Sequence, residues 1–208
     1  MENFFDSAAQ NWDKNQRTIK RTNDIAIELR KVIDFKDGQT ALEFGAGTGL
    51  LSIALKDLFY EITLMDSSLE MMRVTIENLA EKDIHHLTPI LFDLEKEDYT
   101  AKTFDCIYSQ MSLHHVLNID KIITKFYNLL NPGALMAFID LYKEDGTFHE
   151  RDFSEHFGFN PEELEEVLKK SGFKEISYKP CFEITKAEGP NAGKSYPLFL
   201  LTCKKALK

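Results

Sequence analysis

The stretch "ALEFGAGTGLLSIAL", residues 41–55, places three glycines within five positions, between two apolar runs. The run at 40–44 has the length and composition of a buried strand, and the run at 49–59 has the spacing of a helix. Glycine permits sharp turns and a close approach of the backbone to another group. The sequence therefore predicts a strand, a tight turn next to a ligand, and a helix.

Composition limits the kind of protein that this chain can be. A chain of 208 residues, 43% of them hydrophobic, can form one core, so we expect a single domain over 1–208. The net charge of -9 argues against a nucleic-acid partner. The N-terminus does not resemble a secretory signal, and no run reaches the roughly 18 apolar residues of a membrane span. We expect a cytoplasmic protein without membrane contact, and reduced, buried thiols at Cys106, Cys181 and Cys203.

The rest of the chain alternates helical and strand patterns. The expected helices cover 16–33, 49–59, a segment that begins at the Ser67 and Glu70 capping box, 119–130, and a segment from Asn160 and Pro161 to Gly172. The expected strands cover 40–44, 61–66, 88–93, 104–109, 134–141, 173–184 and 196–204, and the last two form an antiparallel hairpin. This alternation predicts an α/β fold with a mostly parallel sheet covered by helices on both faces.

Several candidate ligand-binding residues fall where the predicted parallel strands end, namely Gly45, Asp66, Asp93 and 109–111. In open α/β sheets, ligands bind beyond these carboxyl ends. The glycines do not form a dinucleotide motif, because Leu50 stands where GxGxxG has its last glycine. No Gly-Lys-Ser/Thr directly follows these glycines either, so this turn is not a Walker phosphate loop.

Glu43, Gly45, Gly47 and Gly49 form the pattern ExGxGxG, and Asp66 ends the second strand. Together with "FD" after the third strand, "FDCIYSQMSLHH" at the fourth and "LNPGALMAF" before the fifth, this pattern resembles the class I S-adenosylmethionine-dependent methyltransferases. The resemblance covers nearly the whole chain. It implies a Rossmann-like, doubly wound, seven-stranded sheet of order 3-2-1-4-5-7-6 with strand 7 antiparallel. It also implies S-adenosylmethionine as cofactor and S-adenosylhomocysteine as product.

The resemblance assigns a part of the cofactor to each of these residues. Glu43 is expected near the ammonium group and Asp66 at the ribose hydroxyls, so Asp66→Ala should weaken binding; Asp66 could instead only cap the next helix. The expected contacts of the cofactor carboxylate are the backbone of Gly45, Ala46, Gly47 and Gly49. Those of the adenine are Ser67, Met71, Phe92, Asp93 and Leu94, although Asp93 could be a simple turn residue. Gln110 and Met111 are expected at the methionine part, and Trp12 either over the cofactor or in the core.

Methyl transfer is an in-line displacement, which mainly requires aligned reactants and the exclusion of water. A histidine could serve as general base, and His115 is our candidate, ahead of His114, His149 and His156. Because the histidines lack HExxH spacing, we expect no catalytic metal. We expect residues 1–38 to form an N-terminal helical cap and 141–159 to cover the substrate.

The acceptor is expected to be an O, N, S or C atom of a small molecule. "SQMS" at 109–112 occupies the place where nucleic-acid amino methyltransferases carry Asp/Asn-Pro-Pro-Tyr/Phe. A nicotinamide reductase needs GxGxxG and a Tyr-x-x-x-Lys pair. This chain lacks both, which excludes that class. A non-catalytic cofactor-binding or scaffold protein and a protein methyltransferase stay open as alternatives. The sequence does not specify an oligomeric state.

Overall fold

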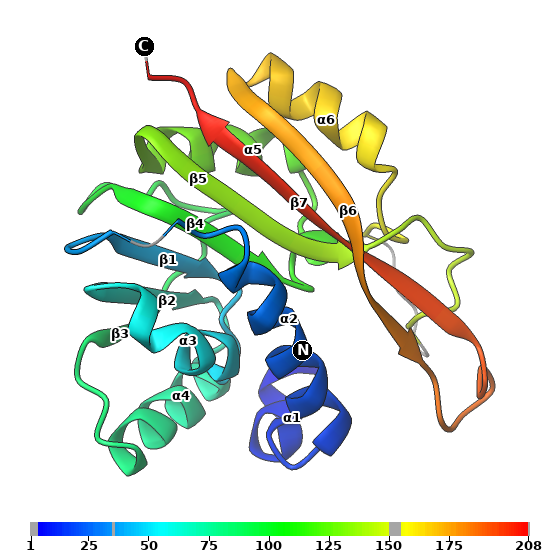
Figure 1. The fold of residues 1–208 in the computed structure, drawn as a ribbon. Helices are drawn as coiled ribbons and strands as arrows, with labels where there is room; N and C mark the ends of the chain where they lie inside the picture. Colours follow the sequence, from blue (N-terminus) through cyan, green and yellow to red (C-terminus); the bar gives the residue numbers. More distant parts are fainter. Residues whose placement is uncertain (1–3, 35, 150–154, 208) are drawn as a thin grey trace.

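Seven strands form one sheet in the order β3-β2-β1-β4-β5-β7-β6 (Figure 1). The computed structural model describes residues 4–34, 36–149 and 155–207. Neighbouring strands from β3 to β5 are parallel, whereas β7 is antiparallel to both β5 and β6. The expected strand order and the antiparallel β7 are thus confirmed. The strands are β1 (Thr40–Phe44), β2 (Glu61–Asp66), β3 (Leu87–Leu91), β4 (Phe104–Gln110), β5 (Leu130–Leu141), β6 (Phe173–Thr185) and β7 (Ser195–Lys205).

Helices cover both faces of the sheet, as the α/β pattern predicts (Figure 1). Successive strand residues point to opposite faces, so Ala41 joins one apolar cluster and Leu42 joins the other. The Ala41 cluster contains the apolar sides of α2, α3 and α4, and the Leu42 cluster contains those of α5 and α6. The helices are α1 (Phe4–Trp12), α2 (Gln16–Arg30), α3 (Leu50–Leu55), α4 (Leu69–Glu81), α5 (Ile119–Leu129) and α6 (Pro161–Lys170).

Three local expectations differ from the structure. Helix α1 was not expected as a separate helix, and β5 begins at Leu130 rather than at 134. The cap of α4 is Ser68, whose Oγ accepts a hydrogen bond from the Met71 amide at 3.1 Å, so the predicted capping box at Ser67 is wrong by one residue. The amide of Ser68 is held by Asp66, which fixes this register.

Helix α1 is fastened to the part of the fold that follows β1 and β2. Asp6 Oδ1 accepts a hydrogen bond from Ser68 Oγ at 2.5 Å. Just after the helix, Asp13 accepts from Thr48 Oγ1 at 2.5 Å and from Asn78 Nδ2 at 2.7 Å. The described N-terminal residues therefore lie beside the carboxyl ends of the strands; residues 1–3 and 35 of the expected cap lie outside the described part.

The prediction that all three cysteines are buried is wrong for Cys181, which lies on β6, the edge strand of the sheet, and is only half-buried. Cys106, Cys181 and Cys203 are free thiols, and Cys106 and Cys203 are buried. Within the described ranges, no helix has both the length and the apolar character that crossing a bilayer requires.

Candidate functional site

A pocket of about 780 Å³ opens where β1, β2, β3 and β4 end. With the exception of Gly49, every residue that the sequence assigned to the cofactor lines it, and so does His115. The fold therefore brings together residues that are up to 72 positions apart, from Glu43 to His115. The assigned residues that line the pocket are Glu43, Gly45, Ala46, Gly47, Asp66, Ser67, Met71, Phe92, Asp93, Leu94, Gln110 and Met111.

The glycine turn after β1 leaves no room for a side chain at Gly45 and little room at Gly49. Gly45 has a φ of +67°, and a Cβ there would lie 2.3 Å from Ser112 Oγ. Gly49 caps α3 with a φ of +80°, and its Cβ would meet Leu64 at 3.0 Å, so its role is conformational. The amides of Gly45 and Ala46 donate to the Met65 carbonyl at 2.9 and 3.0 Å. These internal bonds compete with the carboxylate contact that we expected of this turn.

Glu43 is a buried carboxyl group at the end of β1, with 2% of its surface exposed. It accepts hydrogen bonds from the amide and the hydroxyl of Ser52, and that hydroxyl also contacts Tyr108 Oη at 2.7 Å. Burial raises the pKa of Glu43 to about 8, because no cation offsets the loss of hydration and Asp66 adds like charge. A positively charged ligand group beside it would stabilise its ionised form.

Asp66 ends β2 and is tied to two backbone amides. Its Oδ2 accepts from Gly47 and its Oδ1 from Ser68, each at 2.8 Å. Burial raises the pKa of Asp66, and these amide bonds oppose that shift. A carboxylate offers about four acceptor positions, so Asp66 keeps acceptor capacity for ligand hydroxyls. The bond to the Ser68 amide is the contact at the start of the next helix that the alternative interpretation of Asp66 predicts. The carboxylate also lines the pocket.

The adenine candidates lie after β2 and β3. Leu94 and Met71 are buried, whereas Ser67 is exposed at the pocket. Asp93 accepts from the amides of Glu95 and Lys96, at 3.1 and 3.3 Å, and pairs with the Lys96 ammonium at 2.7 Å. Burial of Asp93 raises its pKa, but these hydrogen bonds outweigh burial and leave the pKa lowered. Asp93 therefore acts as a turn residue, as the alternative interpretation predicts, and it also lines the pocket.

The end of β4 carries a backbone conformation that is rare for a side-chain-bearing residue. Met111 has a φ of +57°, and its amide donates to the Ile139 carbonyl at 2.8 Å. Gln110 donates from Nε2 to Thr22 Oγ1 at 3.1 Å, which ties α2 to this strand end. Strained backbone of this kind concentrates at functional sites.

Sequence reasoning missed Arg21, which reaches the pocket from α2. Within the part of the chain that the structure describes, its buried Nε has no hydrogen-bond partner. Burial lowers the pKa of the guanidinium to about 10, because no anion offsets its desolvation. A buried cation without an anion, in a pocket, is suited to an anionic ligand group. A basic residue one turn into the helix after Trp12 was the available signal, but its burial is set by tertiary packing.

Aromatic side chains of α1 form a further part of the pocket wall. Trp12 packs edge to face on Phe5 with ring centroids 6.2 Å apart, and Phe5 packs on His115 at 5.0 Å. Both Trp12 and Phe5 line the pocket. Trp12 also joins a small apolar cluster with Ala9, so both readings of Trp12 have structural support.

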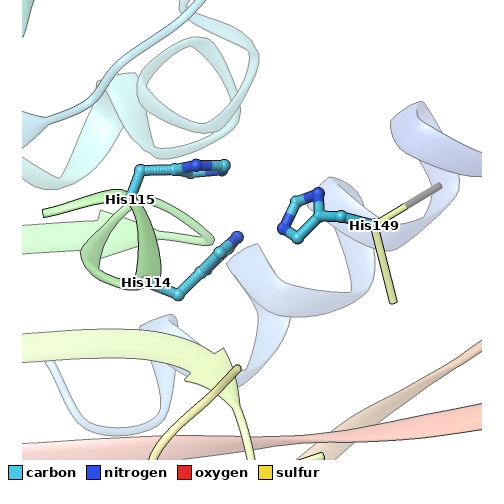
Figure 2. Close-up of side chains that lie close together, drawn as sticks. All are labelled: His114, His115 and His149. Carbon is cyan, nitrogen blue, oxygen red and sulfur yellow. The ribbon is translucent and has the colours of Figure 1, made fainter. Parts of the chain in front are cut away.

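Three histidines meet at the end of the pocket beside β4 and β5 (Figure 2). His114 and His115 lie in a 3-10 turn, Leu113–His115, and His149 lies after β5. His114 Nδ1 bonds to Asp140 Oδ1 at 2.6 Å, and both side chains are 1% exposed. His156 is not among the lining residues, although its amide bonds to the His114 carbonyl. Residues 150–154 of the expected covering segment lie outside the described residues.

Comparisons with known proteins agree with this geometry. A family model described as "Methyltransferase domain" matches residues 15–178, so the chain belongs to that family, the class I S-adenosylmethionine-dependent methyltransferases. An uncharacterized methyltransferase of Schizosaccharomyces pombe is 26% identical over 162 residues, which cover 69% of this chain and 57% of that protein. The curated relatives it matches are longer, and the chain spans 30% to 57% of their length.

Two solved structures show the same fold. The Haloferax volcanii protein in complex with the Trm112 methyltransferase activator has a TM-score of 0.80 at 16% identity, with 100% of both chains covered. Haemonchus contortus phosphoethanolamine N-methyltransferase 2, in complex with phosphomonomethylethanolamine and S-adenosylhomocysteine, has a TM-score of 0.70 at 20% identity. That comparison covers 88% of this chain and 52% of the other. S-adenosylmethionine is the cofactor of this family.

Proposed function

We propose that this chain transfers a methyl group from S-adenosylmethionine to an O, N, S or C atom of a small molecule. The observation that carries the proposal is the single pocket wall formed by Glu43, the glycine turn, Asp66 and Asp93 at successive strand ends. Its volume of about 780 Å³ falls within the range of small-molecule sites. The acceptor named for the Haemonchus contortus enzyme is also a small molecule, which favours this class.

The residues present fit the charged and polar parts of such a cofactor. Arg21 supplies a buried cation that can pair with the carboxylate of the cofactor. Glu43 supplies a buried carboxyl group that would ionise beside the ammonium group of the cofactor. Asp66 has acceptor capacity for a ribose diol. We assign the adenine to the wall of Ser67, Met71, Phe92, Asp93 and Leu94, and the methionine part to Gln110 and Met111. When bound, the cofactor supplies an electrophilic methyl group on a sulfonium.

His115 is the candidate general base of this proposal. Its ring faces the pocket, where Phe5 orients it through an edge-to-face contact at 5.0 Å. An unperturbed imidazole accepts a proton near neutral pH, which suits removal of a proton from an acceptor hydroxyl, amine or thiol. The helices α1 and α2, as the proposed cap, would exclude water from the reacting atoms.

The test is incubation of the purified chain with methyl-labelled S-adenosylmethionine and a metabolite extract, followed by mass spectrometry. A labelled small product that is absent with Asp66→Ala supports the proposal. Parallel incubations with peptides and with RNA examine the other acceptor classes. Label on a peptide alone would favour a protein methyltransferase. Tight cofactor binding without transfer to any acceptor would favour a cofactor-binding or scaffold protein.

A further inference from the structure

His114, His115 and His149 bring three imidazole rings together at one end of the pocket (Figure 2). One ring nitrogen from each residue lies within 4.8 Å of the other two. The ring centroids of His114 and His115 are 4.1 Å apart, and His149 is 5.2 Å from each. Three neutral imidazoles are the ligand set that Zn²⁺, Cu²⁺, Ni²⁺ and Fe²⁺ accept from proteins.

The size of the cluster is close to that of a coordination sphere. Three atoms no more than 4.8 Å apart lie at most about 2.8 Å from a common centre, and zinc binds imidazole nitrogen at about 2.0–2.1 Å. Each nitrogen would have to move inward by at most about 0.7 Å to bind. Side-chain rotations alone cover such a distance, so the backbone can stay where it is.

Asp140 provides a second and independent observation. This carboxylate is fully buried at the end of β5, and it bonds both His114 Nδ1, at 2.6 Å, and the His114 amide, at 3.2 Å. The contact fixes the ring and commits Nδ1, which makes Nε2 the nitrogen that can bind a metal. A carboxylate behind a ligating histidine is a recurrent arrangement in metal sites, where it orients the ring and raises its basicity. It also supplies negative charge next to a dication.

We propose that His114, His115 and His149 form a binding site for a transition-metal dication of the Zn²⁺ class. While a metal is bound, His115 is a ligand, so its role as general base applies to the metal-free chain. All three residues line the pocket, so three protein ligands leave an open coordination position toward it. That position is suited to a water molecule or to a lone-pair oxygen, nitrogen or sulfur atom of a bound molecule. This site differs from our expectation of no metal, which rested on HExxH spacing; His149 lies 34 residues after His115, so no local motif could reveal it.

The test is metal binding by the purified full chain after dialysis against a chelator. We expect one equivalent of Zn²⁺ by isothermal titration calorimetry, and a visible absorption band of a four-coordinate complex when Co²⁺ is added. His149→Ala, at a half-buried position, should abolish the band. The affinity for Zn²⁺ should fall by more than the roughly 10- to 100-fold that is typical when a residue behind a ligand loses its contact. Asp140→Asn, which removes the carboxylate charge behind His114 without replacing a ligand, should fall within this range.

His85→Ala is the matched control, because His85 is exposed and pairs with Asp83 outside the pocket. It should bind Zn²⁺ as the unmodified chain does. Circular dichroism of each variant separates loss of a ligand from loss of folding. The proposal is overturned if the chain binds no Zn²⁺, or if folded His149→Ala binds as tightly as His85→Ala. Because these measurements need neither cofactor nor acceptor, their outcome is independent of methyl transfer.

Discussion

Replacement of Glu43 by glutamine should remove a pH-dependent loss of stability. Burial raises the Glu43 pKa from 4.5 to about 8, so the folded chain keeps a proton that the unfolded chain releases between those values. Stability conferred by the protonated form is therefore complete below pH 4.5 and falls as the pH rises toward 8. At pH 7 the loss amounts to about 3 kcal/mol, and about 2.5 kcal/mol of it develops above pH 5.

The measurement is the free energy of unfolding by urea, followed by circular dichroism, at pH 5, 6 and 7. Glu43→Gln keeps an oxygen that accepts from Ser52 but does not titrate, so its curve should be flatter than that of the unmodified chain by about 2.5 kcal/mol. Asp66, whose pKa burial also raises, titrates in both proteins. Glu81→Gln, an exposed change at the end of α4, should leave the slope unchanged. Equal slopes for Glu43→Gln and the unmodified chain would refute the reasoning.

Three further predictions concern the pocket. Asp66→Ala should weaken the binding of S-adenosylhomocysteine at least about tenfold in calorimetric titration, since one hydrogen bond to a charged group is worth about 1.5–3 kcal/mol. Unchanged affinity would exclude the assignment of Asp66 to the ribose. Arg21→Ala should weaken S-adenosylhomocysteine by about 10- to 150-fold but spare 5′-methylthioadenosine, which lacks the carboxylate; equal losses for both ligands would contradict a carboxylate contact. Gly45→Ala should destabilise the chain in urea by roughly 1–3 kcal/mol for its positive φ and a similar amount for the clash with Ser112. Ser112→Gly in the same chain should recover the second part but not the first.

The strand and helix order was predictable because it depends on local signals. Asn160 caps α6 by accepting from the Glu162 amide at 2.9 Å, and Pro161 is the first helical residue, as the sequence indicated. The start of β5 was not predictable in the same way. Pro132 reads as a break, but the pairing of Leu130 with Phe104 and a register shift let the strand include it. Pairing across the sheet, not local propensity, sets that boundary.

The site residues also fall into two groups, those that local sequence signals reveal and those whose position depends on tertiary packing. Residues that follow strands, such as Glu43 and Asp66, could be found because parallel strands end at one edge of the sheet. Arg21 could not, because which side of α2 becomes buried depends on where that helix packs. Asp140 was embedded in an apolar run, where a charged residue is unusual, and that anomaly was the available signal.

The attachment of α1 has a kinetic consequence. Phe5 and Trp12 form part of the pocket wall, so movement of α1 would widen the opening of the pocket. The helix is held by a few hydrogen bonds that Asp6 and Asp13 accept and by a small apolar cluster, and such elements open at far lower cost than the whole fold. Undocking of this one short helix would then shorten the residence time of a bound nucleoside. Exchange of spent for fresh cofactor could proceed while the sheet and its two cores stay folded.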